Sequence, residues 1–446
     1  MTPASVEVGP FAGDDAVLSQ LEAFVRARLG PATIIEGFSR VTSGRSRQNW
    51  LFDAIWPDGA MMRREPLIVR RDPLGGLLDT DRGTEFAVLR ALAAAPIPTP
   101  QARWLDARGE ELGRPSLVMV RIAGSCDYFA LNGSAPLPDR ISLARRLCSL
   151  MVDVHGVDWR DVGLADVLVD PGPQPSLAAL EHWEAVLRRD QLEPYPELEL
   201  GAQWLRGHAP LSPRTVLVHG DFKVGNTLLD DEGQIVALLD WELAHLGDPH
   251  EDLGWVTQSL RTKEHYIKGS WEREDLLRHY EEVSGNTVDH ESVAWWNAMA
   301  AYKTAVMQAS GLRAFVEGRS PDHYQPSAAV LGAVLNVVSA PTAPTPRSAP
   351  VGDRNAFLAR DTAATEALLE EFGGFGAEVE SRLGPEPSSR ASDAAATNRV
   401  VRGRLVELIK AVPPAESGDP ARRAIAAHLQ ARTLADPSLV RRKGES

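Results

Sequence analysis

The chain has 446 residues, of which 43% are hydrophobic and 24% are charged, and its formal net charge is −14 at pH 7. This length allows two or three domains with ample core, and the composition is that of an ordinary globular protein. The acidic balance argues against nucleic acid as the main partner. Cys126 and Cys148 form neither a zinc pattern nor a disulfide framework, which indicates a reducing compartment.

No membrane or export signal is visible in the sequence. Residues 1–15 lack the basic and apolar regions of a signal peptide. The most apolar window, 328–340, is too short to cross a bilayer. We therefore expect no membrane partner and a cytoplasmic location. No prediction follows for the oligomeric state.

The first part of the chain predicts one helix and then strands. Residues 18–29 have helical periodicity and end at Gly30-Pro31, a helix stop. Residues 33–41, 49–56 and 67–70 predict three strands. We therefore expect a small β-rich unit near the N-terminus.

A polar loop, residues 42–48, joins the first two of these strands. Its backbone amides and the hydroxyls of Thr42, Ser43 and Ser46 suit a phosphate group. Gly44 by itself is not a glycine-rich loop, so an ordinary hairpin turn explains this segment equally well. Both interpretations stay open at this point.

The next segments predict a helix at 81–94 and strands at 101–106 and 116–121. Helices are then expected over 138–155, 176–189, 197–207, 251–260, 272–283 and 291–316. Trp183 and Trp204 lie on the second and third of these helices. They suit either core packing, which we favour, or the wall of a substrate pocket.

A Pro/Ala/Thr-rich segment at 340–346 predicts an extended linker. Beyond it, residues 356–383, 391–411 and 420–435 predict polar amphipathic helices. Their low aromatic content favours a small bundle or a partly docked appendage.

The most informative stretch runs from Val216 to Glu242. An apolar strand ends at His219-Gly220-Asp221, and the apolar runs 227–229 and 235–239 predict a hairpin. A hairpin centred on Gly233 would place Asn226 directly opposite Asp240, with their backbones about 4.5–5.5 Å apart. A carboxylate and an amide oxygen suit Mg²⁺, which takes few protein ligands plus nucleotide phosphates.

Asn226 follows Asp221 by five positions, which is the spacing of a kinase catalytic loop. Asp240-Trp241-Glu242 and Gly247-Asp248-Pro249, with Asp252-Leu253 following, come later in the same order. Together these motifs resemble the aminoglycoside phosphotransferase and choline kinase superfamily. More narrowly, the chain is similar to the branch with the kinase-like domains of certain acyl-CoA dehydrogenase fusion proteins.

The resemblance implies ATP and Mg²⁺ as cofactors and a catalytic role for Asp221 and Lys223. Asp221 would align the acceptor hydroxyl and take its proton late, while Lys223 would approach the γ-phosphate or be a solvated loop cation. Asn226 and Asp240 would hold Mg²⁺. His219 and Asp252 would support the loop, Asp252 by accepting hydrogen bonds from backbone amides.

The resemblance also implies a nucleotide site between the lobes. Arg70 would bind phosphate and pair with Glu85, and Arg71 replaces Arg70 if the strand register slips by one. Ser43, Gly44 and Ser46 would lie over the phosphates, although the family's usual Gly-Gly-x-Ser-Asn is absent. The backbone of Met119 and Val120 would bind adenine. An ordinary edge strand explains these last two residues equally well.

The implied fold class is α+β, a bilobal protein-kinase-like fold with a C-terminal helical appendage. We expect an N-lobe at 1–120, a C-lobe at 121–340, a linker at 341–350 and the appendage at 351–446.

The implied function is phosphate transfer from ATP to the hydroxyl of a small molecule. A hydroxyacyl-CoA-like metabolite comes first, an aminoglycoside or macrolide second, and choline-like amines third. A nucleotide-binding pseudokinase or scaffold is the alternative from another class. It is disfavoured because Asp221, Asn226 and Asp240 are all present. A protein kinase is disfavoured by Gly220 and by the lack of an activation segment.

Overall fold

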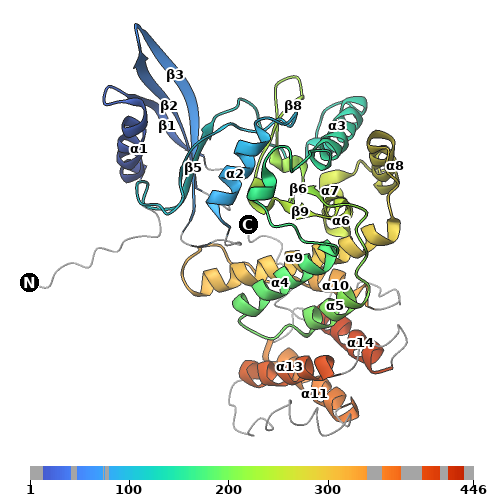
Figure 1. The fold of residues 1–446 in the computed structure, drawn as a ribbon. Helices are drawn as coiled ribbons and strands as arrows, with labels where there is room; N and C mark the ends of the chain where they lie inside the picture. The colour runs from blue at the N-terminus through green and yellow to red at the C-terminus, as the bar shows by residue number, and fades with distance from the viewer. Residues whose placement is uncertain are drawn as a thin grey trace, which may run out of the picture.

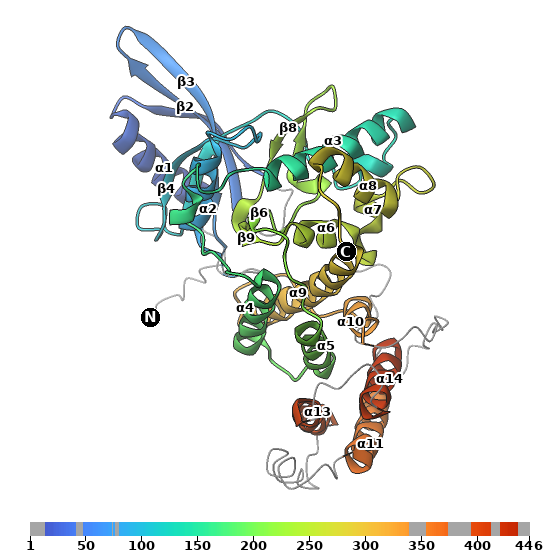
Figure 2. The same cartoon turned by 45° about the vertical axis from the view of Figure 1, so that its right-hand side comes forward.

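The computed structural model describes residues 14–41, 48–73, 75, 80–338, 354–372, 394–411 and 420–435. A β-rich lobe, a larger helical lobe and a C-terminal group of helices follow one another in space (Figures 1 and 2). This is the bilobal α+β architecture that the motifs imply. The linker expected at 341–350 lies outside the described residues.

A five-stranded antiparallel sheet in the order β1-β2-β3-β5-β4 forms the first lobe. Its strands are β1 (Ile34–Val41), β2 (Gln48–Asp58), β3 (Met61–Arg71), β4 (Ala102–Asp106) and β5 (Ser116–Val120). Successive strand residues point to opposite faces. One face, which includes Trp50, Phe52 and Val118, packs on helix α1 (Asp14–Leu29). The other face, which includes Leu117 and Met119, packs on α2 (Arg82–Leu92) and belongs to the core that continues into the second lobe.

Short strands and helices build the second lobe. The strands are β6 (Val216–Val218), β7 (Thr227–Leu229), β8 (Ile235–Leu238) and β9 (His245–Gly247). The helices are α3 (Leu137–His155), α4 (Pro175–Asp190), α5 (Pro196–Gly207), α6 (Pro249–Thr257), α7 (Thr262–His265), α8 (Arg273–Ser284), α9 (His290–Val316) and α10 (Ala328–Leu335). Asp248, directly before Pro249, caps α6.

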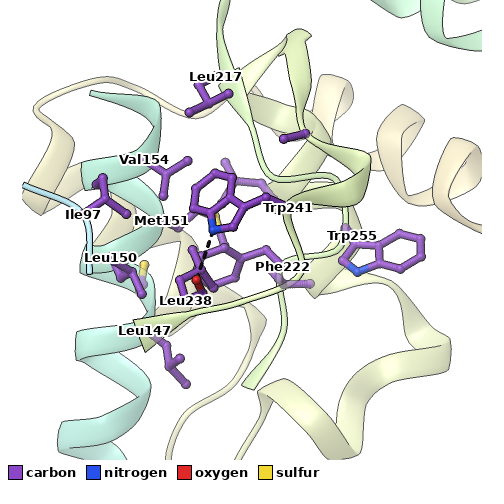
Figure 3. Packing of buried hydrophobic residues seen from close by; sticks show 14 of the residues in the cluster. Ile97, Leu147, Leu150, Met151, Val154, Leu217, Phe222, Leu238, Trp241 and Trp255 are labelled. Carbon is purple, nitrogen blue, oxygen red and sulfur yellow. Dashed lines mark hydrogen bonds between the residues drawn. The ribbon is translucent and has the colours of Figure 1, made fainter. Parts of the chain in front are cut away.

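Trp241 anchors the segment between β8 and β9 in the core. Figure 3 shows its indole among Met151, Val154 and Phe222, with the ring N–H donating to the Leu238 carbonyl oxygen at 3.0 Å. Because this fully buried side chain follows Asp240 directly, its packing fixes the backbone from which Asp240 projects.

The hairpin register differs from the sequence prediction by one residue. Thr227 pairs with Leu238, and the Leu239 N–H donates to the Asn226 carbonyl at 2.7 Å, so Asn226 lies opposite Leu239 and not Asp240. Next to the turn Leu229 pairs with Ile235, which centres the hairpin on Glu232, and a bulge between Leu228 and Leu229 then shifts the pairing by one residue. The prediction assumed a regular ladder centred on Gly233 and was wrong on this point.

The C-terminal helices dock on the second lobe. They are α11 (Arg354–Phe372), α13 (Ala394–Ala411) and α14 (Pro420–Ala435), and they lie at the end of the molecule away from the sheet (Figure 1). Leu200 of α5 and Leu335 of α10 share one hydrophobic cluster with Val401, Leu405 and Leu429. Glu197, at the start of α5, is fully buried beneath them. No described helix is long and apolar enough for a membrane span.

Candidate active site

Asp252 of α6 holds the loop that follows β6 through hydrogen bonds. Its carboxylate accepts the backbone N–H groups of His219 at 2.8 Å and Gly220 at 2.9 Å, as the sequence predicts. Gly220 has φ +79°, and a Cβ there would lie 2.6 Å from the Leu243 carbonyl oxygen. Glycine is therefore required at this position by both conformation and space.

His219 supports the loop as a neutral imidazole. Its Nε2 donates to the Leu239 carbonyl at 2.9 Å, so Nδ1 is the acceptor that faces the Asp221 N–H at 3.3 Å. Burial lowers the pKa of His219, which favours this neutral form. Its ring therefore ties the hairpin to the loop that follows β6.

Asp252 is buried as a carboxylate. Burial by itself would raise its pKa, but hydrogen bonds from His155 and from the His219 amide lower the pKa to about 2 from the usual 3.8. A lowered folded-state pKa stabilises the fold above the unfolded pKa, and this contribution is lost as pH falls through about 2.

We expect Asp252→Asn to lower the free energy of unfolding by about 2 kcal/mol at neutral pH. The deficit should shrink between pH 4 and pH 2, because the wild-type carboxylate becomes protonated there. Urea unfolding at several pH values measures this. Asp139→Asn, at an exposed position, is the control. A deficit independent of pH would show that the charge of Asp252 does not matter.

Asp221 lies in a cluster of donors. Lys223 Nζ is 2.5 Å from Asp221 Oδ2, and Asn226 Nδ2 donates to the same oxygen at 3.1 Å and to the Asp221 carbonyl at 3.0 Å. Burial opposes charge on both partners, yet their attraction lowers the pKa of Asp221 and raises that of Lys223. The other carboxylate oxygen, Oδ1, is buried and has no hydrogen-bond partner among the described residues.

Arg70 joins the sheet to the second lobe. Its guanidinium donates to Glu85 at 2.9 Å, the pair expected from the sequence, and to Asp240 at 2.7 Å. Burial by itself would raise the pKa of Asp240, and the charge of Arg70 lowers it. Asp240 has φ 70°, the only positive φ of a non-glycine residue in the described parts of the chain, so its side chain is aimed by an unusual backbone. Arg71, the alternative, is not the partner of Glu85 in this register.

Sequence reasoning missed Arg82. This fully buried residue contacts Glu85, bonds Glu242 at 2.7 Å and lies 3.1 Å from Asp72. The buried guanidinium groups of Arg70 and Arg82 thus connect Glu85 of α2 to the segment that contains Asp240 and Glu242. The signal in the sequence was the spacing of Arg82 and Glu85, three residues apart on one helix.

The predicted nucleotide contacts are only partly described. Met119 is packed in the core, and the Val120 N–H donates to the Gln101 carbonyl at 2.9 Å. Adenine binding by these two residues stays a prediction. Ser43, Gly44 and Ser46 lie outside the described residues.

The side chains present fit a magnesium ion bound together with phosphates. Asn226 and Asp240 offer the hard oxygen ligands that Mg²⁺ prefers, and the nearby charge of Asp221 acts to raise the pKa of Asp240. Such mutual repulsion favours a bound cation. Within the described residues, no group of three His, Cys, Asp or Glu side chains is arranged to hold a metal by itself. The remaining ligands would have to come from the nucleotide.

A cavity of about 500 Å³ opens next to the segment that follows Asp240, and its lining includes Glu242 and Leu243 but not Asp221, Asn226 or Asp240 themselves. Its walls are α4, the start of α2, part of α9 and the segment after Asp240. The α4 wall is mainly apolar and includes Ala178, Ala179, Trp183 and Val186. Trp183 therefore packs in the core and also lines the cavity, whereas Trp204 packs on the core and stacks on His208.

Comparison with known proteins finds relatives of part of this chain. The chain is 30% identical over 195 residues to "Acyl-CoA dehydrogenase family member 10" of Mus musculus, and 27% identical over 201 residues to family member 11 of Gallus gallus. These matches cover 42% and 43% of this chain but 18% and 25% of those proteins, so only a minor part of each relative is matched.

A solved structure of a putative aminoglycoside phosphotransferase from Ralstonia eutropha shares the fold. Its TM-score is 0.53 at 21% identity, and the match covers 71% of this chain and 93% of that one. The sequence profile described as "Phosphotransferase enzyme family" matches residues 37–296, more than half of the chain. The chain therefore belongs to the phosphotransferase enzyme family.

Proposed function

We propose that the chain is an ATP- and Mg²⁺-dependent kinase that phosphorylates the hydroxyl of a small, largely apolar acceptor of the hydroxyacyl type. The observation that carries this acceptor class is the lining of the cavity that Lys303 connects to the loop of Asp221. The proposed division is a nucleotide-binding N-lobe at 1–120, a C-lobe at 121–340, a linker at 341–350 and an appendage at 351–446.

In this proposal, the free Oδ1 of Asp221 receives the hydrogen bond of the acceptor hydroxyl. Asp221 orients that hydroxyl and takes its proton late, because a carboxylate of lowered pKa is a weak base toward a free alcohol. Asn226 and Asp240 bind the metal, and Arg70 and Lys223 bind phosphate oxygens. When bound, ATP would supply the phosphoryl group, and Mg²⁺ would supply positive charge that neutralises the phosphate oxygens.

The cavity is well suited to an apolar chain. It adjoins the catalytic loop through Lys303, which lines the cavity and donates to the Gly220 carbonyl at 2.6 Å. Its α4 wall offers alanine, valine and tryptophan side chains, which favour hydrocarbon over a sugar ring rich in hydroxyl and amino groups.

The carboxylates of this cavity already have partners. Glu242 bonds Arg82 at 2.7 Å, Glu251 bonds His245 at 3.0 Å, and Asp81 caps α2. A polycationic acceptor such as an aminoglycoside needs carboxylates that can accept its ammonium groups. The paired state of these acids therefore favours the hydroxyacyl class over the aminoglycoside class.

The test is ATP- and Mg²⁺-dependent transfer to a mixed library, with product mass as the readout. The library holds hydroxyacyl-CoAs, free hydroxy acids, aminoglycosides, macrolides and amino alcohols. A phosphorylated hydroxyacyl product supports the proposal. A phosphorylated aminoglycoside or macrolide instead would overturn the acceptor class, and failure to bind Mg·ATP would overturn the kinase assignment.

We expect Ala178→Phe to abolish acceptor binding while Mg·ATP binding stays close to wild type. The larger side chain would occupy part of the cavity on the α4 wall, away from Asp221 and Asp240. Calorimetric titration with Mg·ATP and steady-state kinetics with the acceptor measure the two effects. Glu181→Phe, at an exposed position on α4 that does not line the cavity, is the matched control. Equal KM values for the acceptor in wild type and Ala178→Phe would exclude this cavity as the acceptor site.

A further inference from the structure

Lys303 is a buried cation that the catalytic motifs do not account for. It lies in the middle of α9, and its side chain is 5% exposed. Burying an ammonium group is costly unless it is paired and hydrogen-bonded. The contacts of Lys303 therefore indicate what the residue does.

The Lys303 ammonium reaches the catalytic loop. It donates to the Gly220 carbonyl oxygen at 2.6 Å and lies 3.7 Å from the Glu251 carboxylate of α6. It also lies 4.8 Å from the ring centroid of Trp255 and 5.4 Å from that of Trp183. An anion, a carbonyl oxygen and two aromatic faces thus surround the charge, all of which favour it.

Both backbone groups of Gly220 are consequently bound to buried charges. The Gly220 N–H donates to Asp252 of α6, and its carbonyl accepts from Lys303 of α9. This carbonyl belongs to the peptide that leads directly into Asp221. With φ of +79°, Gly220 adopts a conformation that glycine can leave easily, so the two contacts restrict an otherwise permissive residue.

We infer that Lys303 is a positioning residue, which holds the Gly220–Asp221 peptide so that the Asp221 carboxylate faces the acceptor. The effect on kcat expected from this inference rests on the proposed function. The effect on the order of the loop does not. Because Lys303 also lines the cavity, it connects the acceptor cavity with the loop that carries Asp221.

The test compares Lys303→Met with Lys303→Arg in the full chain. Hydrogen–deuterium exchange of the amides in residues 216–226 reports loop order without any acceptor. We expect faster exchange there in Lys303→Met and partial restoration in Lys303→Arg. With the acceptor found by library screening, kcat should fall about 10²-fold in Lys303→Met, as for a misplaced catalytic group, with little change in the KM for ATP.

Trp295→Phe is the matched control on the same helix. The Trp295 indole donates to the Leu205 carbonyl at 2.9 Å and so ties α9 to α5, away from the catalytic loop. This variant should lower the melting temperature about as much as Lys303→Met does. It should leave exchange in residues 216–226 unchanged.

The outcomes separate the two proposals. Wild-type exchange in residues 216–226 of Lys303→Met would overturn the positioning role, whatever the activity. The same faster exchange in Trp295→Phe would overturn it too, because it would show a general loosening of α9. Faster exchange confined to the Lys303 variants, in a chain that phosphorylates none of the acceptors, would support the positioning role and count against the proposed function.

Discussion

Asp221→Asn is expected to lower kcat by about 10²–10⁴-fold, the range typical for loss of a group that accepts a proton in the transition state. The amide keeps the shape of the side chain but loses the negative charge that Lys223 contacts. Since Asp221 is proposed to act on the acceptor and not to hold adenine, the Kd for Mg·ATP should stay within a few-fold of wild type.

Single-turnover transfer and nucleotide titration measure these two quantities. Asp231→Asn is the control, because Asp231 is exposed in the turn between β7 and β8. Transfer at the wild-type rate in Asp221→Asn would remove Asp221 from the mechanism. A large loss of Mg·ATP binding would show instead that its main contribution is to metal binding.

Arg432→Met is expected to lower the free energy of unfolding by about 3–5 kcal/mol, the cost of breaking a buried ion pair. Arg432 of α14 donates to Glu197 at 3.0 Å and to Asp361 of α11 at 2.9 Å, and Arg402 of α13 donates to Glu197 at 2.8 Å. Removing one guanidinium leaves two buried carboxylates with too little positive charge.

Urea unfolding measures this loss. Arg423→Met, on the exposed side of α14, should change the stability by less than about 0.5 kcal/mol. Equal stability of Arg432→Met and wild type would show that the C-terminal helices dock mainly through their apolar contacts. A large loss would establish that they form a structural unit with α5.

The C-terminal helices show how a sequence pattern can underestimate docking. Few aromatic residues favoured a bundle or a partly docked appendage. The structure adds a cluster shared by Leu200, Leu335 and Leu405 and a fully buried Glu197. The sequence pattern of α5 does not reveal this burial, because the arginines that bind Glu197 come from residues more than 200 positions later.

The catalytic motifs were the most predictable part of the molecule. Phosphoryl transfer needs an acid, an amide and a second acid in a short and ordered stretch, so Asp221, Asn226 and Asp240 stand out by spacing. The family and the bilobal fold that these motifs imply are both confirmed by the comparisons. The catalytic and binding roles of the individual residues stay predictions until the variants are measured.

What the sequence determined by itself is therefore local: the strand that ends at His219-Gly220-Asp221 and the existence of the hairpin that follows it. The family resemblance added the pairing of Arg70 with Glu85. The tertiary structure decided the register that places Asn226 opposite Leu239, the burial of Arg82, the paired carboxylates of the cavity and the contact of Lys303 with Gly220. The physical reason is range. Spacing along the chain encodes contacts within one loop or helix, whereas a buried charge is specified by partners that only the packing of distant helices brings within hydrogen-bond distance.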